Sequence, residues 1–265
     1  MPSKKHSGRC PLFRLQKSQG NIMSLRKTIN KRLQGTHYHI NKINPALNVN
    51  SCQHLIKINI EYFLARELLE SEGFFFVQIG ANDGVRADES YDFITRHQLP
   101  GVVVEPLADM FEKLSENYSH HPQIKKVNKA IHSSARTMPL YRIKNDADVP
   151  DWCHGIASFD KEHLLSGSKK IPQLEKYIIE ESVDCISLDE LFAQTKTSQI
   201  SFLQIDTEGY DFEIIKMIDF NQYKPKIIRY ECCTLSVADN QACIDLLAKQ
   251  GYQFFDEGND IIALL

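Results

Sequence analysis

The sequence predicts an α/β fold in which a mostly parallel sheet is closed by a C-terminal antiparallel hairpin. Short apolar runs typical of buried strands alternate with helical patterns from residue 74 onward, which favours βαβ units. The runs at 252–256 and 260–265 flank the turn Glu257-Gly258-Asn259, which is a hairpin signal. No repeat with a period of about 20 to 50 residues is visible, which argues against a solenoid.

Each element follows from a local pattern. Residues 55–70 carry an apolar stripe at helical spacing, and the apolar run 74–79 between glycines predicts the first buried strand. The later expected elements are strands at 101–105, 124–131, 137–143, 183–187, 200–206 and 225–231, and helices within 82–98 and at 107–118, 188–194, 209–220 and 236–250. Residues 144–181 show no clear period, although 171–181 is compatible with a helix.

Charge divides the chain into two parts. The net charge is −3, but residues 1–60 contain 11 Lys and Arg and no Asp or Glu, so the remainder holds 20 basic and 34 acidic residues. We therefore expect a basic N-terminal extension at 1–54 and an acidic domain at 55–265. Residues 61–265, with a net charge of −14, would repel phosphates, which disfavours nucleic acid as a partner.

The extension itself divides in two. Residues 1–21 lack apolar periodicity and are expected to be disordered, whereas 22–35 predict a short basic amphipathic helix. Such a helix either binds an anionic membrane surface or nucleic acid, or lies on the acidic domain or in solvent. Because Met23 stands where this helix begins, the true translation start stays open.

Seven cysteines without a C-x-x-C pair predict reduced thiols and a cytoplasmic protein. The N-terminus has no apolar signal-peptide region, and no run approaches the roughly 18 apolar residues of a membrane span. We therefore expect no transmembrane segment, and the sequence leaves the oligomeric state open.

The carboxyl ends of the first two strands indicate a cofactor site, because open α/β sheets bind ligands there. The first strand runs into Gly80-Ala81-Asn82-Asp83-Gly84, where backbone can approach a ligand closely, and Glu105 ends the second, where a carboxylate can accept both hydroxyls of a ribose. The alternative is a tight turn for the loop and a helix N-terminal charge for Glu105. Without a G-x-G-x-x-G fingerprint or a P-loop, a nicotinamide dehydrogenase is disfavoured.

Three further acids follow strands. Asp206 and Glu208 lie in the segment IDTEG, and Glu231 lies in RYECC. They would converge if their strands are neighbours, since adjacent strands lie about 4.8 Å apart. Such a cluster could act as a general base for a hydroxyl, bind a divalent cation or hold a substrate, whereas helix capping is an equal alternative for Glu208.

Successive motifs of the chain resemble the FkbM-type S-adenosylmethionine-dependent methyltransferases. The matching segments, which together cover about residues 74–265, are VQIGANDG (77–84), VVVEPLADMFEKL (102–114), VNKAI (127–131), SLDELF (187–192), FLQIDTEGYDFEIIK (202–216) and RYE (229–231). The resemblance implies a Rossmann-like methyltransferase fold that uses S-adenosylmethionine. It further implies that Gly80, Asn82 and Gly84 border the methionine part of the cofactor, that Glu105 holds its ribose, and that Asn128 to Ala130 border the adenine.

One position departs from the family pattern. Many such enzymes have an acid two residues before the first glycine, whereas this chain has Gln78. An amide can orient the loop through hydrogen bonds but cannot pair with the cofactor's ammonium as a charge would. We expect Gln78, Asp83 and Ala130 at the cofactor site beside the residues already named, and residues 144–181 as a substrate-facing insertion.

The resemblance points to O-methylation of a hydroxyl on a sugar, glycan or small metabolite. Asp206 is expected nearest the proton transfer, with Glu208 and Glu231 shaping or charging the acceptor pocket; His154 is a rival base, and a surface histidine is the alternative for it. No histidine forms a metal motif with a cysteine, so we assign no metal ligand, and the metal dependence stays open. The competing hypothesis is a catalytically silent Rossmann-like binding module that uses its basic arm for an anionic partner.

Overall fold

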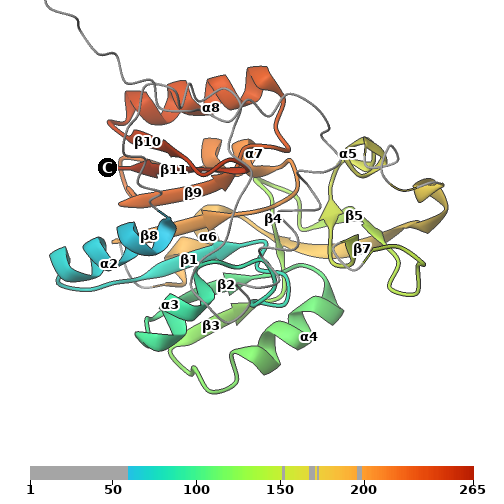
Figure 1. The fold of residues 1–265 in the computed structure, drawn as a ribbon, viewed down its shortest axis with the longest axis horizontal. Helices are drawn as coiled ribbons and strands as arrows, with labels where there is room; N and C mark the ends of the chain where they lie inside the picture. The colour runs from blue at the N-terminus through green and yellow to red at the C-terminus, as the bar shows by residue number, and fades with distance from the viewer. Residues whose placement is uncertain (1–58, 151–152, 167–170, 172, 196–198) are drawn as a thin grey trace, which may run out of the picture. The chain divides into compact units, whose positions relative to one another are not determined.

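The computed structural model describes residues 59–150, 153–166, 171, 173–195 and 199–265. These residues form an α/β domain with a central sheet covered by helices on both faces (Figure 1). The basic extension, including the helix expected at 22–35, lies outside the described residues. Among the helices that the structure describes, none has the length and apolar character needed to cross a lipid bilayer.

A seven-stranded sheet with the order β10-β11-β9-β8-β1-β2-β3 forms the centre. Five of its strands run parallel to one another: β1 (Phe76–Ile79), β2 (Gly101–Val104), β3 (Ile124–Val127), β8 (Phe202–Ile205) and β9 (Ile227–Glu231). The C-terminal hairpin joins β10 (Gln253–Asp256) to β11 (Asp260–Leu264), and β11 is antiparallel to both of its neighbours. The prediction of a parallel sheet closed by a hairpin is therefore confirmed.

Two apolar cores lie on the two faces of this sheet. Helices α2 (Ile60–Glu70), α3 (Tyr91–Arg96) and α4 (Ala108–Asn117) contribute to the core that contains Phe76 and Phe202. Helices α6 (Leu188–Ala193), α7 (Asp211–Lys216) and α8 (Val237–Lys249) contribute to the core that contains Val77 and Leu203. Because the inner strands are buried on both faces, their sequences are nearly continuous apolar runs.

A second, four-stranded sheet was not predicted. Its order is β4 (Ala130–Ile131), β7 (Ile178–Ile186), β5 (Thr137–Ile143) and β6 (Ala157–Ser158). The single strand expected at 124–131 is thus wrong, because the chain leaves the central sheet after Val127 and pairs again, with β7, from Ala130. The helix compatible with 171–181 is also wrong: a 3-10 turn at Leu174–Tyr177 is followed directly by β7.

The topology places a crevice at the carboxyl end of β1. This strand pairs with β2 on one side and with β8 on the other, so the strand order changes direction at this point of the sheet while the strands stay parallel. Residues 144–177 connect β5 to β7 and contain α5 (Lys161–Ser166) as well as β6. In Figure 1, α5, β5 and β7 lie together to one side of the central strands.

Candidate active site

The loop after β1 is shaped by a close approach between two neighbouring strand ends. Gly80 has φ +78°, and a side chain there would overlap the backbone carbonyl of Asp206, which follows β8. The N–H groups of Gly80 and Ala81 both donate to the carbonyl of Val104 at 3.0 Å. Only glycine therefore fits at position 80, and the loop lies over the end of β2.

Glu105 ties this loop to the start of α4. One carboxylate oxygen accepts the N–H of Asn82 and the other accepts the N–H of Leu107, each at 2.9 Å. Burial raises the pKa of Glu105 to about 7, although these two donors oppose the rise. Both the turn-stabilising role and the ribose-binding role remain open to this carboxylate, because each oxygen can accept a second hydrogen bond.

Asp206, Glu208 and Glu231 do converge. Their nearest carboxylate oxygens all lie within 4.8 Å of one another. The buried side chain of Asp211 explains this, because its two oxygens bind Thr207 in the β8–α7 loop and the N–H of Glu231 at the end of β9. The condition stated from the sequence, that β8 and β9 are neighbours, is met.

Burial and crowding alter the ionisation of Asp206 and Glu231. Burial, followed by repulsion from Glu231 and Glu208, raises the pKa of Asp206 well above its ordinary value, although Asp206 is an exposed residue. Burial, followed by repulsion from Glu208 and Asp211, raises the pKa of Glu231 to about 7. Glu231 can therefore exchange a proton near neutral pH, and Asp206 binds a proton more tightly than an ordinary aspartate does.

Residues of the insertion fix the position of Glu208. The hydroxyl of Ser158 in β6 donates to its main-chain carbonyl at 2.8 Å, and Nε2 of His163 in α5 lies 3.4 Å from its carboxylate. The pKa of His163 is raised chiefly by this hydrogen bond with Glu208. Glu208 is thus held in place through both its main-chain carbonyl and its carboxylate.

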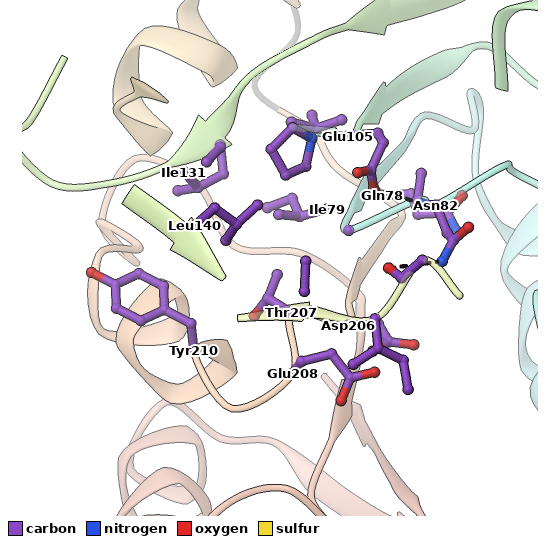
Figure 2. Close-up of a pocket in the computed structure, with 18 of the residues that line it drawn as sticks. Gln78, Ile79, Asn82, Glu105, Ile131, Leu140, Asp206, Thr207, Glu208 and Tyr210 are labelled. Atoms are coloured by element: carbon purple, nitrogen blue, oxygen red, sulfur yellow. Dashed lines mark hydrogen bonds between the residues drawn. The ribbon is translucent and has the colours of Figure 1, made fainter. Parts of the chain in front are cut away.

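A cavity of about 190 Å³ lies between Glu105 and two loops. One is the glycine loop (80–84) after β1, and the other is the acidic loop (206–210) between β8 and α7. Figure 2 shows Gln78, Asn82, Asp206 and Glu208 toward one end, whereas Ile131, Leu140 and Tyr210 give the other end a more apolar lining. Asn82 also donates to the carbonyl of Gly155 at 3.3 Å, so the insertion contacts the loop at the polar end. The cavity could therefore hold a ligand with one apolar and one polar end.

The residues expected at the site divide into two groups. Seven line the cavity, namely Gln78, Gly80, Asn82, Glu105, Ala130, Asp206 and Glu208. Four do not: Asp83 accepts N–H bonds within its own loop, Gly84 packs against Tyr118, Asn128 donates to the carbonyls of Glu105 and Pro106, and Glu231 meets the cavity only through the acidic cluster.

His154 is not the surface histidine that was the alternative for it. It is half-buried and lines the cavity, and its Nδ1 has no hydrogen-bond partner among the described residues. Its carbonyl accepts a hydrogen bond from Arg86 at 3.0 Å. His154 therefore remains a rival base by position.

Some cavity residues were missed from the sequence. Gln204 had a signal, because FVQI (76–79) and FLQI (202–205) place a polar residue at the same point of two apolar strands. Asp88 had none, because the helix expected within 82–98 begins only at Tyr91 and leaves a turn that carries Asp88 to the cavity.

The sheet order and the switch point beside a glycine loop define a Rossmann-like methyltransferase fold. The chain belongs to the FkbM methyltransferase family, because the model of the methyltransferase FkbM domain matches residues 78–254. The resemblance found in the motifs is thereby confirmed. Family and fold together imply the use of S-adenosylmethionine.

Solved methyltransferase structures align with the chain at low similarity. Methyltransferase FkbM from Methylobacillus flagellatus KT has 14% identity and a TM-score of 0.44, over 73% of this chain and 44% of its own. The N-terminal domain of human METTL16 has 13% identity and a TM-score of 0.40, over 77% of this chain and 66% of its own. A crystal form of the METTL16 methyltransferase domain has 12% identity and a TM-score of 0.42, over 77% and 64%. This chain therefore spans less than two thirds of each of them, and no curated protein sequence matches it significantly.

Proposed function

We propose that this chain is an S-adenosylmethionine-dependent O-methyltransferase that acts on a hydroxyl of a sugar, glycan or small metabolite. The observation that carries the proposal is the meeting of a glycine loop, a strand-end acid and a proton-exchanging carboxylate cluster around one cavity. The first two are suited to a ribose-bearing donor, and the third is suited to an acceptor with a removable proton.

The residues present fit the cofactor on two observations. Gly80 and Glu105 line the same cavity, so the glycine loop and the strand-end acid can both contact one ribose-bearing ligand. The side-chain oxygens of Gln78 and Gln204 are buried at the cavity without a hydrogen-bond partner among the described residues. A donor-rich ligand would satisfy both oxygens.

Particular residues would hold each part of the cofactor. Glu105 would accept the ribose hydroxyls, and Gly80 and Asn82 would border the methionine part. Ala130 would border the adenine, with Ile131 and Leu140 adding apolar surface next to it. Asp83, Gly84 and Asn128 would hold the surrounding loops in shape.

When bound, S-adenosylmethionine supplies an electrophilic methyl group, so the protein mainly has to align the acceptor and remove its proton. Asp206 would accept the proton of the acceptor hydroxyl. Glu208 and Glu231 would support this by keeping the pKa of Asp206 high, which makes its carboxylate a stronger base. No metal is invoked, because a shared proton can offset the charge of the cluster.

Calorimetry and turnover test the proposal together. We expect the wild-type chain to bind S-adenosylmethionine and S-adenosylhomocysteine and to methylate members of a panel of sugars and small hydroxyl compounds. Asp206→Asn should bind both ligands with nearly unchanged affinity and lose turnover. Absence of binding to either ligand would exclude a methyltransferase, and unchanged turnover of Asp206→Asn would remove Asp206 from its role.

Binding without turnover on any acceptor would instead favour the silent binding module. An anionic partner of the basic extension would then be sought with the full chain and with a variant that lacks residues 1–54. A cytoplasmic location is proposed on the thiols: the five cysteines among the described residues are all unbridged, and three of them are buried. Cell fractionation tests this location.

A further inference from the structure

A buried polar row crosses the central sheet beneath the glycine loop. Gln78 on β1, Gln204 on β8 and Arg229 on β9 are in register, so their side chains lie next to one another on the same face. They are only 2%, 4% and 7% exposed. Buried polar groups need hydrogen-bond partners, and the three residues differ in whether they have them.

Arg229 has its partners within the fold. Its guanidinium contacts Glu257 at 2.8 Å, Asp260 at 3.0 Å and Glu89 at 3.3 Å. These three carboxylates surround a single cation, so the guanidinium of Arg229 is fully paired within the fold. It does not line the cavity, whereas both glutamines do.

The two glutamines each keep one unpartnered oxygen. Nε2 of Gln78 donates to Oδ2 of Asp88 at 3.2 Å, so the amide cannot be turned round without setting its oxygen against a carboxylate. This fixes Oε1 of Gln78 as the unpartnered atom, and Oε1 of Gln204 on the neighbouring strand is unpartnered as well. The neighbouring strands thus place two buried, unpartnered acceptors in residues that line the cavity.

Asp88 adds a carboxylate at the same place; burial raises its pKa, and hydrogen bonds from Ser90 and Gln78 and the charge of Arg229 oppose that rise. It lines the cavity, and its other oxygen, Oδ1, accepts the N–H and the hydroxyl of Ser90 at 2.8 and 2.7 Å. These two donors and Gln78 hold the carboxylate in position before any ligand arrives. Asp88 and the two amides together offer acceptors and one negative charge.

We propose that Asp88 is the anion that binds the α-ammonium of the cofactor, with the side-chain oxygens of Gln78 and Gln204 as its neutral co-acceptors. An ammonium group carries a positive charge and three donors and no acceptor, which is the complement of these three side chains. Asp88 thereby supplies, from the turn before α3, the charge that Gln78 cannot supply from β1. The proposal rests on the proposed use of S-adenosylmethionine and goes beyond it by assigning a residue.

A pair of ligands separates this role from a structural one. S-Adenosylhomocysteine carries the amino acid part, and 5′-methylthioadenosine has the same nucleoside without it. Asp88→Asn keeps the shape of the side chain and removes its charge, so it should lower the affinity for S-adenosylhomocysteine by about 10- to 100-fold. It should change the affinity for 5′-methylthioadenosine by no more than about 3-fold, since that ligand has no ammonium.

Glu89→Gln is the matched control, because it removes a charge one residue away that faces Arg229 and does not line the cavity. It should leave the affinities for both ligands unchanged. Gln204→Met, which keeps the volume and removes the amide, is the second variant. It should weaken S-adenosylhomocysteine selectively even if Asp88→Asn does not fold.

The outcomes are distinguishable by calorimetry on the full chain. If wild-type protein binds neither ligand, the proposed function fails and this assignment falls with it. Suppose that the wild-type protein binds S-adenosylhomocysteine. If Asp88→Asn then lowers the affinity for both ligands equally, or changes neither affinity, Asp88 does not bind the ammonium and only the assignment is overturned. Equal loss of both ligands by Gln204→Met would overturn the role of the amides in the same way.

Discussion

The side-chain hydroxyl of Ser158 donates a 2.8 Å hydrogen bond to the main-chain carbonyl of Glu208, fifty positions further along the chain. Ser158 is buried in the insertion, and Glu208 stands at the tip of the acidic loop with φ +51°. Residues other than glycine rarely take this conformation, so surrounding contacts must hold it. The insertion therefore helps to build the acidic cluster as well as to cover it.

Ser158→Ala should release this loop. The carbonyl of Glu208 would lose a buried partner, at a cost of about 1 to 2 kcal/mol in the free energy of unfolding. Hydrogen exchange should become faster at the amides of 207–211. Ser201→Ala is the control, because its buried hydroxyl contacts the carbonyl of Gly73 outside the cavity; equal exchange in the two variants would contradict the role of Ser158.

Gly80→Ala should be far more damaging than the same change at Gly258. Both glycines have positive φ, but a Cβ at Gly80 would overlap the carbonyl of Asp206, whereas at Gly258 it would meet open space. We expect a loss of about 1 kcal/mol at Gly258, from the backbone conformation alone, and about 3 kcal/mol or more at Gly80. Urea unfolding measures both, and similar losses would show that the two strand ends separate easily.

The central sheet could be predicted from the sequence because each of its inner strands is a local apolar run with a polar residue or a glycine at its end. The second sheet could not, because β7 pairs with β5 from Thr137 opposite Asp184 to Ile143 opposite Ile178, a contact between distant segments. Its first five residues, Ile178–Ser182, are exposed or half-buried, so they give no strong apolar signal. The break after β3 was hidden too, since Asn128 leaves the strand to bind the carbonyls of Glu105 and Pro106.

The site was predictable to the extent that strand ends determine it. Glu105, Asp206 and Glu231 follow predicted strands, and their convergence depends only on strand order. Asp88 and His163 were missed because their positions depend on a turn and on the insertion, which local periodicity does not describe. In turns and loops of this kind, tertiary contacts decide which residues a side chain meets.

Stability should fall as the pH rises from about 4.5 to 7. Burial raises the pKa of Glu105 from 4.5 to about 7, so the folded state binds more protons than the unfolded state in this interval. The stabilisation is complete below the unfolded pKa and is lost as the pH passes the folded pKa; it is worth at most about 3 kcal/mol. Glu231 and His163 act in the same direction.

Glu105→Gln should flatten this dependence, because an amide does not titrate. It should also lower stability at acidic pH, since one of the N–H groups of Asn82 and Leu107 would face an amide NH₂. Urea unfolding at several pH values measures both effects. A wild-type stability that increases between pH 4.5 and 7, or a variant with the same slope, would contradict the assignment.

Removal of divalent cations should leave the folded chain and its affinity for S-adenosylhomocysteine unchanged. The oxygens of Asp206, Glu208 and Glu231 are close enough to share a cation, but the raised pKa values of Asp206 and Glu231 mean that protons already offset part of the charge of the cluster near neutral pH. Thermal unfolding and calorimetry in EDTA and in excess Mg²⁺ compare the chain without and with a divalent cation. Glu231→Gln is the matched variant, because it removes one carboxylate of the cluster. A melting temperature that rises with Mg²⁺ in the wild-type chain and not in Glu231→Gln would instead show that these carboxylates form a metal site, and the proton acceptor would then have to be sought at His154.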